Sequence, residues 1–203
     1  MMSITARRME EKQQRIESIT QAALELFAEK GYSDCNMNDI AARARLGKAT
    51  LYYYFPNKEA LFKFLLKRET EKFYRKAIET IRGEMQPLSA IRKLLFFYLD
   101  YFANNPKLLN LFFPMGKSSP VVLRRDPNWE KEAENLRTPI DRYFKQVFAR
   151  SELNVPADRL LKIVWTFLIG ASVKLAQGHS VKNIRSEMNF VIQILEKYIS
   201  GEK

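Results

Sequence analysis

The chain has 203 residues, of which 46% are hydrophobic and 28% are charged, a balance typical of a globular protein with a sizeable core. Its net charge is +11, and most of the positive excess lies beyond residue 70, where it indicates either a solvated basic surface or an anionic partner. An apolar run long enough to cross a membrane is absent, and the single cysteine, Cys35, excludes an internal disulfide. We therefore expect a cytoplasmic protein with no membrane partner.

The first helices are predicted from apolar spacing and from residues that favour helix ends. Apolar residues at helical intervals predict a helix over residues 10–30, and Gly31 fits its C-terminal end. Asn36 is a good N-cap for the next helix, and Asp39 three residues later can complete a capping box. A short helix is therefore expected to follow Asn36.

A tight turn at Arg-Leu-Gly, residues 45–47, leads into a second short helix over residues 48–53. This helix stops at Phe-Pro-Asn, because the residue before a proline is disfavoured in helical geometry. Leu51 faces inward, while a lysine and several hydroxyl groups face outward. Two short helices joined in this way, the second carrying polar groups, suit the major groove of DNA.

Three stretches in this part of the chain form a specific pattern: AALELFAEKGY at 22–32, MNDIAARA at 37–44 and KATLYYYFPNKEALF at 48–62. Together they resemble the DNA-binding domain of the TetR/AcrR family of transcriptional regulators. Arg45 stands where this family usually has Gly, and Gly47 stands where it usually has a hydroxyl-bearing cap. We therefore expect Arg45 to adopt an unusual backbone conformation.

The candidate DNA contacts lie on the second short helix and at its flanks. Lys48 at the helix N-terminus suits a phosphate, Thr50 can reach a phosphate or a base edge, and Ala49 leaves room for close approach. Tyr54 and Phe55 are expected to pack inward instead. Partly by carry-over from matching family positions, the predicted contacts are Asn36, Lys48, Ala49, Thr50, Tyr52, Tyr53 and Lys58.

The rest of the chain is also predicted to be helical. The expected segments are helices over 57–82, 88–103, 129–150, 157–177 and 181–200, a short apolar segment after Pro106, and a loop over 116–128. Pro139 is expected to kink or restart the helix that contains it. The predicted fold is all-α, with a helix-turn-helix DNA-binding domain over residues 1–56 and a helical ligand-binding and dimerisation domain over residues 57–203.

Aromatic residues are abundant in the second domain, and two interpretations of them stand. They fill the core of a helical bundle, or some of them line a cavity for an apolar ligand, as the family resemblance implies. Asp100, which interrupts an apolar helix, is a candidate polar anchor. The predicted lining residues are Phe97, Asp100, Tyr101, Phe112, Met115, Tyr143, Val147 and Trp165.

The resemblance implies a homodimeric repressor that binds double-stranded palindromic operator DNA, pairs through its last two helices and is released by a small apolar or amphipathic effector. Arg92, Lys93, Arg124 and Arg125 motivate an anionic effector, and an organic cation is the opposing hypothesis. No nucleophile or metal motif accompanies Cys35 and the single histidine, His179, so we expect neither an enzyme nor a cofactor or metal. The remaining alternative is a helical ligand carrier.

Overall fold

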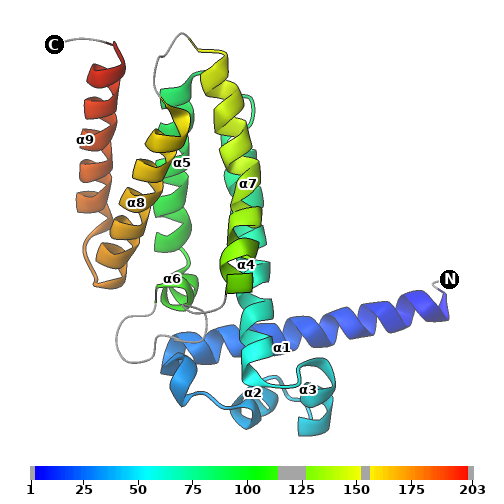
Figure 1. The fold of residues 1–203 in the computed structure, drawn as a ribbon. Coiled ribbons are helices and arrows are strands. Elements are labelled where there is room, and N and C mark those ends of the chain that lie inside the picture. The colour runs from blue at the N-terminus through cyan, green and yellow to red at the C-terminus, as the bar shows by residue number, and fades with distance from the viewer. Residues whose placement is uncertain (1–2, 114–126, 152–155, 201–203) are drawn as a thin grey trace. The chain divides into compact units, whose positions relative to one another are not determined.

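The computed structural model describes residues 3–113, 127–151 and 156–200, and within these residues the chain forms nine α-helices and no strand (Figure 1). The predicted all-α class is confirmed. The helices are α1 (Ile4–Asp34), α2 (Met37–Arg43), α3 (Lys48–Tyr54), α4 (Lys58–Ile81), α5 (Pro87–Ala103), α6 (Pro106–Phe112), α7 (Pro127–Ala149), α8 (Ala157–Ala176) and α9 (Val181–Ser200).

The chain divides into two compact units. The first comprises Met1–Glu69 with Asn110–Arg125, and the second comprises Thr70–Leu109 with Asp126–Lys203. Helix α4 begins in the first unit and ends in the second. The predicted domain division after residue 56 remains a prediction.

In the first unit, α1 starts earlier than predicted because Ser3 caps it. The Ser3 hydroxyl accepts a hydrogen bond from the backbone amide of Ala6 at 3.1 Å. Near its other end, Gly31 leaves helical geometry with φ 79° and ψ 166°, and a short turn continues to Asp34. The predicted helix end at Gly31 is therefore a break, which a glycine tolerates because it lacks a Cβ atom.

The core of the first unit is made by one face of α1, by α2 and α3, and by the start of α4. The rings of Phe27, Tyr32 and Phe62 contact one another with centroids 4.9–5.7 Å apart, which joins the end of α1 to α4. Fully buried aliphatic side chains complete it: Ile19, Ala23, Leu26, Ile40, Leu51, Leu61 and Leu65.

In the second unit, α5, α8 and α9 lie side by side, and α7 packs on α5 and α8 (Figure 1). The observed bounds of α5, α8 and α9 agree closely with the predicted ranges, whereas α7 continues through Pro139 rather than restarting there. The core of the second unit contains Leu94, Leu95, Leu99, Ile140, Phe144, Leu168 and Met188. Most of the predicted loop over 116–128 lies outside the described residues.

A buried polar contact joins two helices of this unit. The hydroxyls of Tyr98 on α5 and Ser172 on α8 are 2.7 Å apart, and Ser172 Oγ donates to the Leu168 carbonyl at 3.0 Å. The Tyr98 hydroxyl must therefore be the donor to Ser172 Oγ. Burial raises the pKa of Tyr98 above its ordinary value.

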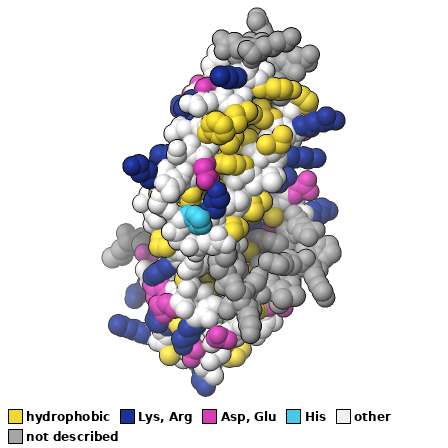
Figure 2. Space-filling view, turned by 90° about the vertical axis from the view of Figure 1, so that its left-hand side faces the viewer, with side chains coloured by type: hydrophobic (Ala, Val, Ile, Leu, Met, Phe, Trp, Pro, Cys, Tyr) yellow, Lys and Arg dark blue, Asp and Glu magenta, His cyan; other side chains and the backbone are white. Residues whose placement is uncertain are grey.

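Large apolar side chains are exposed on the outer face of α8 and α9. They are Ile163 and Ile169 on α8, and Phe190, Ile194 and Tyr198 on α9, each at least half exposed. Figure 2, which views the side of the molecule that carries α9, shows hydrophobic side chains gathered there. None of the described helices combines the length and the low charge that crossing a membrane requires.

Candidate nucleic-acid interface

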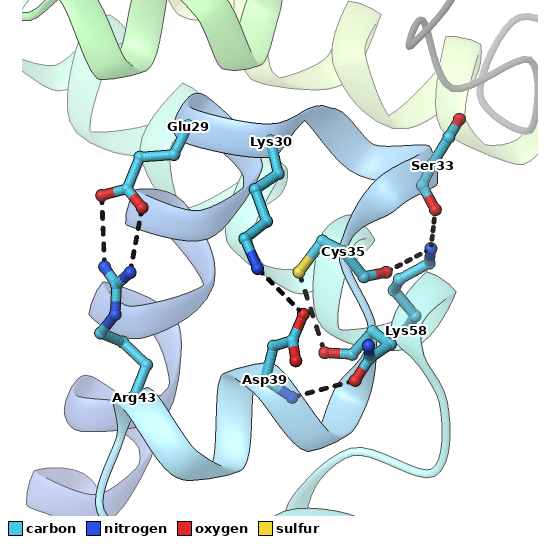
Figure 3. Close-up of polar contacts among 8 residues, drawn as sticks. Glu29, Lys30, Ser33, Cys35, Asp39, Arg43 and Lys58 are labelled. Carbon is cyan, nitrogen blue, oxygen red and sulfur yellow. Dashed lines mark hydrogen bonds and ion pairs between the residues drawn. The ribbon is translucent and has the colours of Figure 1, made fainter.

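Helix α2 begins at the cap that the sequence predicts. Asn36 Oδ1 accepts a hydrogen bond from the Asp39 amide at 3.0 Å, and the Asp39 carboxylate accepts from Lys30 Nζ at 3.3 Å (Figure 3). One half of the predicted capping box is present, and the Asp39 side chain ties α2 to α1 instead. Asn36 itself is exposed beside these contacts.

The other end of α2 is fixed to α1 by a charged contact. Arg43 donates to Glu29 at 3.0 and 3.2 Å and to Glu25 at 3.3 Å. The hydrogen bonds to Glu29 and then to Glu25 raise the pKa of Arg43. Both ends of this seven-residue helix are thus tied to α1, so α2 provides a fixed support for the helix that follows.

The turn between α2 and α3 contains the backbone strain that the sequence predicts. Arg45 has a φ of 56°, the left-handed region that L-residues other than Asn and Asp rarely adopt. The Leu46 amide donates to the Ala41 carbonyl at 2.9 Å, which closes the turn. Gly47 is the N-cap of α3 and provides no side-chain hydrogen bond.

Helix α3 is anchored by one residue and presents most of the rest. Leu51 is fully buried, and Phe55 behind it is buried as expected. Tyr53 is 81% exposed and Tyr52 is 48% exposed. Lys48 and Ala49 are also exposed, whereas Thr50 and Tyr54 are half-buried. The helix therefore offers one cation, hydroxyl groups and a small side chain on its accessible surface.

Lys58, the last predicted contact, lies at the start of α4 with its ammonium turned to the end of α1. Nζ donates to the carbonyls of Tyr32 at 2.7 Å, Ser33 at 3.3 Å and Cys35 at 2.7 Å. The neighbouring Cys35 thiol is buried, and burial raises its pKa. Lys58 is therefore engaged within the first unit.

Three of the predicted ligand contacts lie around two aromatic residues of α4, Phe73 and Tyr74. These two residues were not predicted from the sequence. Phe97 and Tyr101 contact each other and pack on Phe73 at 5.6 and 5.2 Å between ring centroids. The ring of Trp165 contacts Tyr74 at 6.1 Å. The recurrence of apolar residues at 73, 77 and 81 was the available signal, because it predicts one buried face of α4.

Other predicted ligand contacts are placed elsewhere. Asp100 forms an ion pair with Arg185 of α9, and Tyr143 on α7 donates to the Glu84 carbonyl at 2.7 Å. Val147 is buried in the core. Phe112 belongs to the first compact unit, and Met115 lies outside the described residues.

Trp165 carries an unusual polar group. Among the described residues, its indole Nε1 is a buried donor with no hydrogen-bond partner. Leaving such a donor unpaired costs about 1–3 kcal/mol, so the group needs an explanation. Burial also raises the pKa of its neighbour Tyr74 to about 12.

The basic residues that motivate an anionic effector are partly neutralised. Arg92 pairs with Glu196 at 2.7 Å, and Lys93 pairs with Glu84 at 2.8 Å. The hydrogen bond from Lys93 lowers the pKa of Glu84. Arg124 and Arg125 lie outside the described residues.

Comparisons with known proteins agree with this architecture. The family model of bacterial regulatory proteins of the tetR family matches residues 19–65, which contain α2 and α3. The HTH-type transcriptional regulator RutR of Escherichia coli K12 is 30% identical over 107 residues, which are 52% of this chain and 50% of RutR. The chain thus spans about half the length of that curated relative.

Two solved structures share the fold over nearly their whole length. The transcriptional regulator FadR from Bacillus subtilis, solved with stearoyl-CoA, has a TM-score of 0.70 at 21% identity and covers 92% of this chain and 99% of its own. A putative transcriptional regulator from Saccharomonospora viridis, solved with choline, has a TM-score of 0.73 at 16% identity. The alignment covers 88% of this chain and 95% of that protein. The motifs and these comparisons identify residues 19–65 as a domain of the tetR family of bacterial regulatory proteins, and the described residues as a whole share the fold of the two solved structures.

Proposed function

We propose that this protein is a ligand-responsive transcriptional repressor that binds operator DNA with α3. The observation that carries the proposal is the surface of α3, where Lys48, Ala49, Tyr52 and Tyr53 are exposed while Leu51 anchors the helix. A cation at the helix N-terminus suits a phosphate, and hydroxyl groups and a small residue suit close approach to base edges. The ties from α2 to α1 support this presentation because they fix the helix that precedes α3.

We propose further that two copies pair through α8 and α9. The exposed side chains of Ile163, Phe190, Ile194 and Tyr198 support this, since exposed apolar patches on such helices mark association sites (Figure 2). A homodimer presents two α3 helices related by a two-fold axis, which suits a palindromic operator.

The proposed effector is an amphipathic molecule held in the second unit. Phe73, Phe97 and Tyr101 provide apolar contacts, and the unpaired Trp165 Nε1 suits a hydrogen-bond acceptor such as a carbonyl or carboxylate oxygen. The relative solved with stearoyl-CoA holds a ligand that has acceptors, whereas choline is a cation. We favour the acyl class because of the unpaired donor.

Helix α4 is the proposed link between ligand and DNA. It carries Lys58 at its first turn in one unit and Phe73 and Tyr74 in the other. An effector that binds one conformation of α4 more tightly shifts the population toward that conformation. Such coupling is reciprocal, so operator DNA must weaken effector binding by the same factor.

Selection of bound sequences from random duplex DNA tests the DNA-binding proposal. We expect the protein to enrich a two-fold symmetric sequence whose half-sites are about one helical turn apart or a multiple of it. Recovery of unrelated sequences only, at physiological salt, would contradict the proposal and favour a ligand carrier.

Fluorescence titration with stearoyl-CoA and with choline tests the effector class. In a Trp129→Phe background, we expect stearoyl-CoA to change the Trp165 emission and to release the selected DNA. Trp165→Phe removes one hydrogen-bond donor, so it should raise the stearoyl-CoA concentration needed to release the selected DNA about tenfold. A response to choline without a response to the acyl thioester would refute the acyl class.

A further inference from the structure

The ammonium of Lys58 has as many acceptors as it has hydrogens. An ammonium carries three donors and no acceptor, and Nζ donates to three carbonyls, those of Tyr32, Ser33 and Cys35. Figure 3 shows Lys58 between the Ser33 and Cys35 carbonyls at the end of α1. A phosphate could accept a hydrogen bond from Lys58 only if one of these contacts were broken.

These carbonyls lie where the α1 backbone requires a donor. The chain leaves helical geometry at Gly31 and is extended at Cys35, the C-cap, with φ −93° and ψ 137°. Carbonyls at the end of a helix lack partners inside the helix and form the negative end of its dipole. The half-buried ammonium of Lys58 supplies both the hydrogen bonds and the complementary charge at this position.

The Lys58 ammonium also contacts the face of an aromatic ring. Nζ lies 4.4 Å from the centroid of the Tyr32 ring, a cation–π geometry. That ring packs on Phe27 of α1 and Phe62 of α4. Lys58 is therefore fixed from two sides, by carbonyls and by the aromatic core of the first unit.

We propose that Lys58 is a positioning residue for α3 and not a phosphate ligand, an inference that rests on the proposed DNA-binding function. Cys35, whose carbonyl Lys58 holds, directly precedes Asn36, the N-cap of α2. Lys58 follows the loop that ends α3. It thus joins the segment that enters the helix-turn-helix to the segment that leaves it, and so sets the placement of α2 and α3.

Salt dependence of DNA binding separates a positioning residue from a phosphate ligand. Each lost phosphate contact lowers the slope of log Kd against log salt by about 1. The variants are Lys58→Met, which keeps an apolar stem, and Lys58→Arg, which keeps the charge but whose planar fork is unsuited to three converging carbonyls. Lys48→Met is the control for a phosphate contact, and the probe is the duplex selected by the wild-type protein.

We expect both Lys58 variants to bind on the order of tenfold more weakly with an unchanged slope, and Lys48→Met to lower the slope by about 1. A lower slope for Lys58→Met with full binding by Lys58→Arg would show a phosphate ligand and overturn the inference. Failure of the wild-type protein to select DNA would instead overturn the proposed function.

A second measurement excludes a role in stability alone and needs no DNA. Hydrogen exchange of the free protein should become faster in Lys58→Met for the amides of Asp39 and Ile40, which both donate to Asn36. Ile19→Val, a core variant of α1, is a control for general destabilisation, since Ile19 is fully buried. Equal exchange of the Asp39 and Ile40 amides in Lys58→Met and the wild type, or equal DNA affinity, would overturn the positioning role.

Discussion

Arg45 shows how one residue can depart from its ideal conformation without changing the fold. Its φ of 56° is imposed by the tight turn between α2 and α3, where the Leu46 amide bonds back to Ala41. A left-handed backbone brings Cβ close to the carbonyl oxygen and costs roughly 1–2 kcal/mol for a residue with a side chain. A glycine would remove this strain.

We predict that Arg45→Gly raises the free energy of unfolding by about 1 kcal/mol, since the relief of strain exceeds the added chain entropy of glycine. Ala42→Gly is the matched control, because Ala42 is exposed in α2 with helical geometry, and we expect it to lower stability by about 1 kcal/mol. Urea unfolding of both variants provides the test. A lower free energy of unfolding in Arg45→Gly than in the wild type would contradict the proposal that the Arg45 backbone is strained.

Tyr74 gives a prediction of pH dependence. Burial raises its pKa to about 12, above the value near 10 in the unfolded chain. Its contribution to stability is thus fully present below pH 10 and is lost as the pH rises toward 12, because the unfolded chain releases the proton first. We expect Tyr74→Phe to lose about 2 kcal/mol less stability over this range than the wild type.

At the scale of elements, hydrogen bonds at helix ends and between helices decide details that the sequence pattern does not contain. The apolar pattern and caps predicted α2, α3, α5, α8 and α9 closely, because these helices have strong local signals. The Ser3 cap extended α1 beyond its apolar face, and Pro139 did not restart α7. Lys58 could be assigned only from its neighbours in space.

The contact between α5 and α8 allows a test of hydrogen-bond direction. Ser172→Ala leaves the buried Tyr98 hydroxyl without its acceptor and should lower the free energy of unfolding by about 1–3 kcal/mol. Tyr98→Phe should cost less, because Ser172 keeps its bond to the Leu168 carbonyl. The double variant should be more stable than Ser172→Ala. A double variant that is less stable would contradict the assigned donor.

At the scale of the whole molecule, the exposed apolar face of α8 and α9 predicts the state of assembly. Phe190 is 63% exposed, so a charge there does not disturb the core of a single chain. We predict that Phe190→Asp converts a dimer into a folded monomer, measured by sedimentation, and weakens binding to the selected duplex. Met85→Asp is the control, since Met85 is 59% exposed but lies between α4 and α5 rather than on α8 or α9. A dimeric Phe190→Asp would contradict the proposed interface.

The ligand site was the part of the molecule least predictable from sequence. Periodicity identifies buried faces, but it does not distinguish a ring that fills the core from one that can contact a ligand. Phe73 and Tyr74 became candidates only when their contacts with Phe97, Tyr101 and Trp165 were visible. Asp100 turned out to pair with Arg185, a contact between helices far apart in sequence.

The most direct test of the central claim is the affinity of the protein for its selected duplex and for a scrambled duplex at about 0.15 M salt. We expect a preference of about a thousandfold or more for the selected duplex. Thr50→Ala and Tyr53→Phe on α3 should weaken that affinity, and the control Thr80→Ala, an exposed threonine on α4, should not. Equal affinity for both duplexes, or an equal effect of the α3 variants and this control, would contradict recognition of DNA by α3.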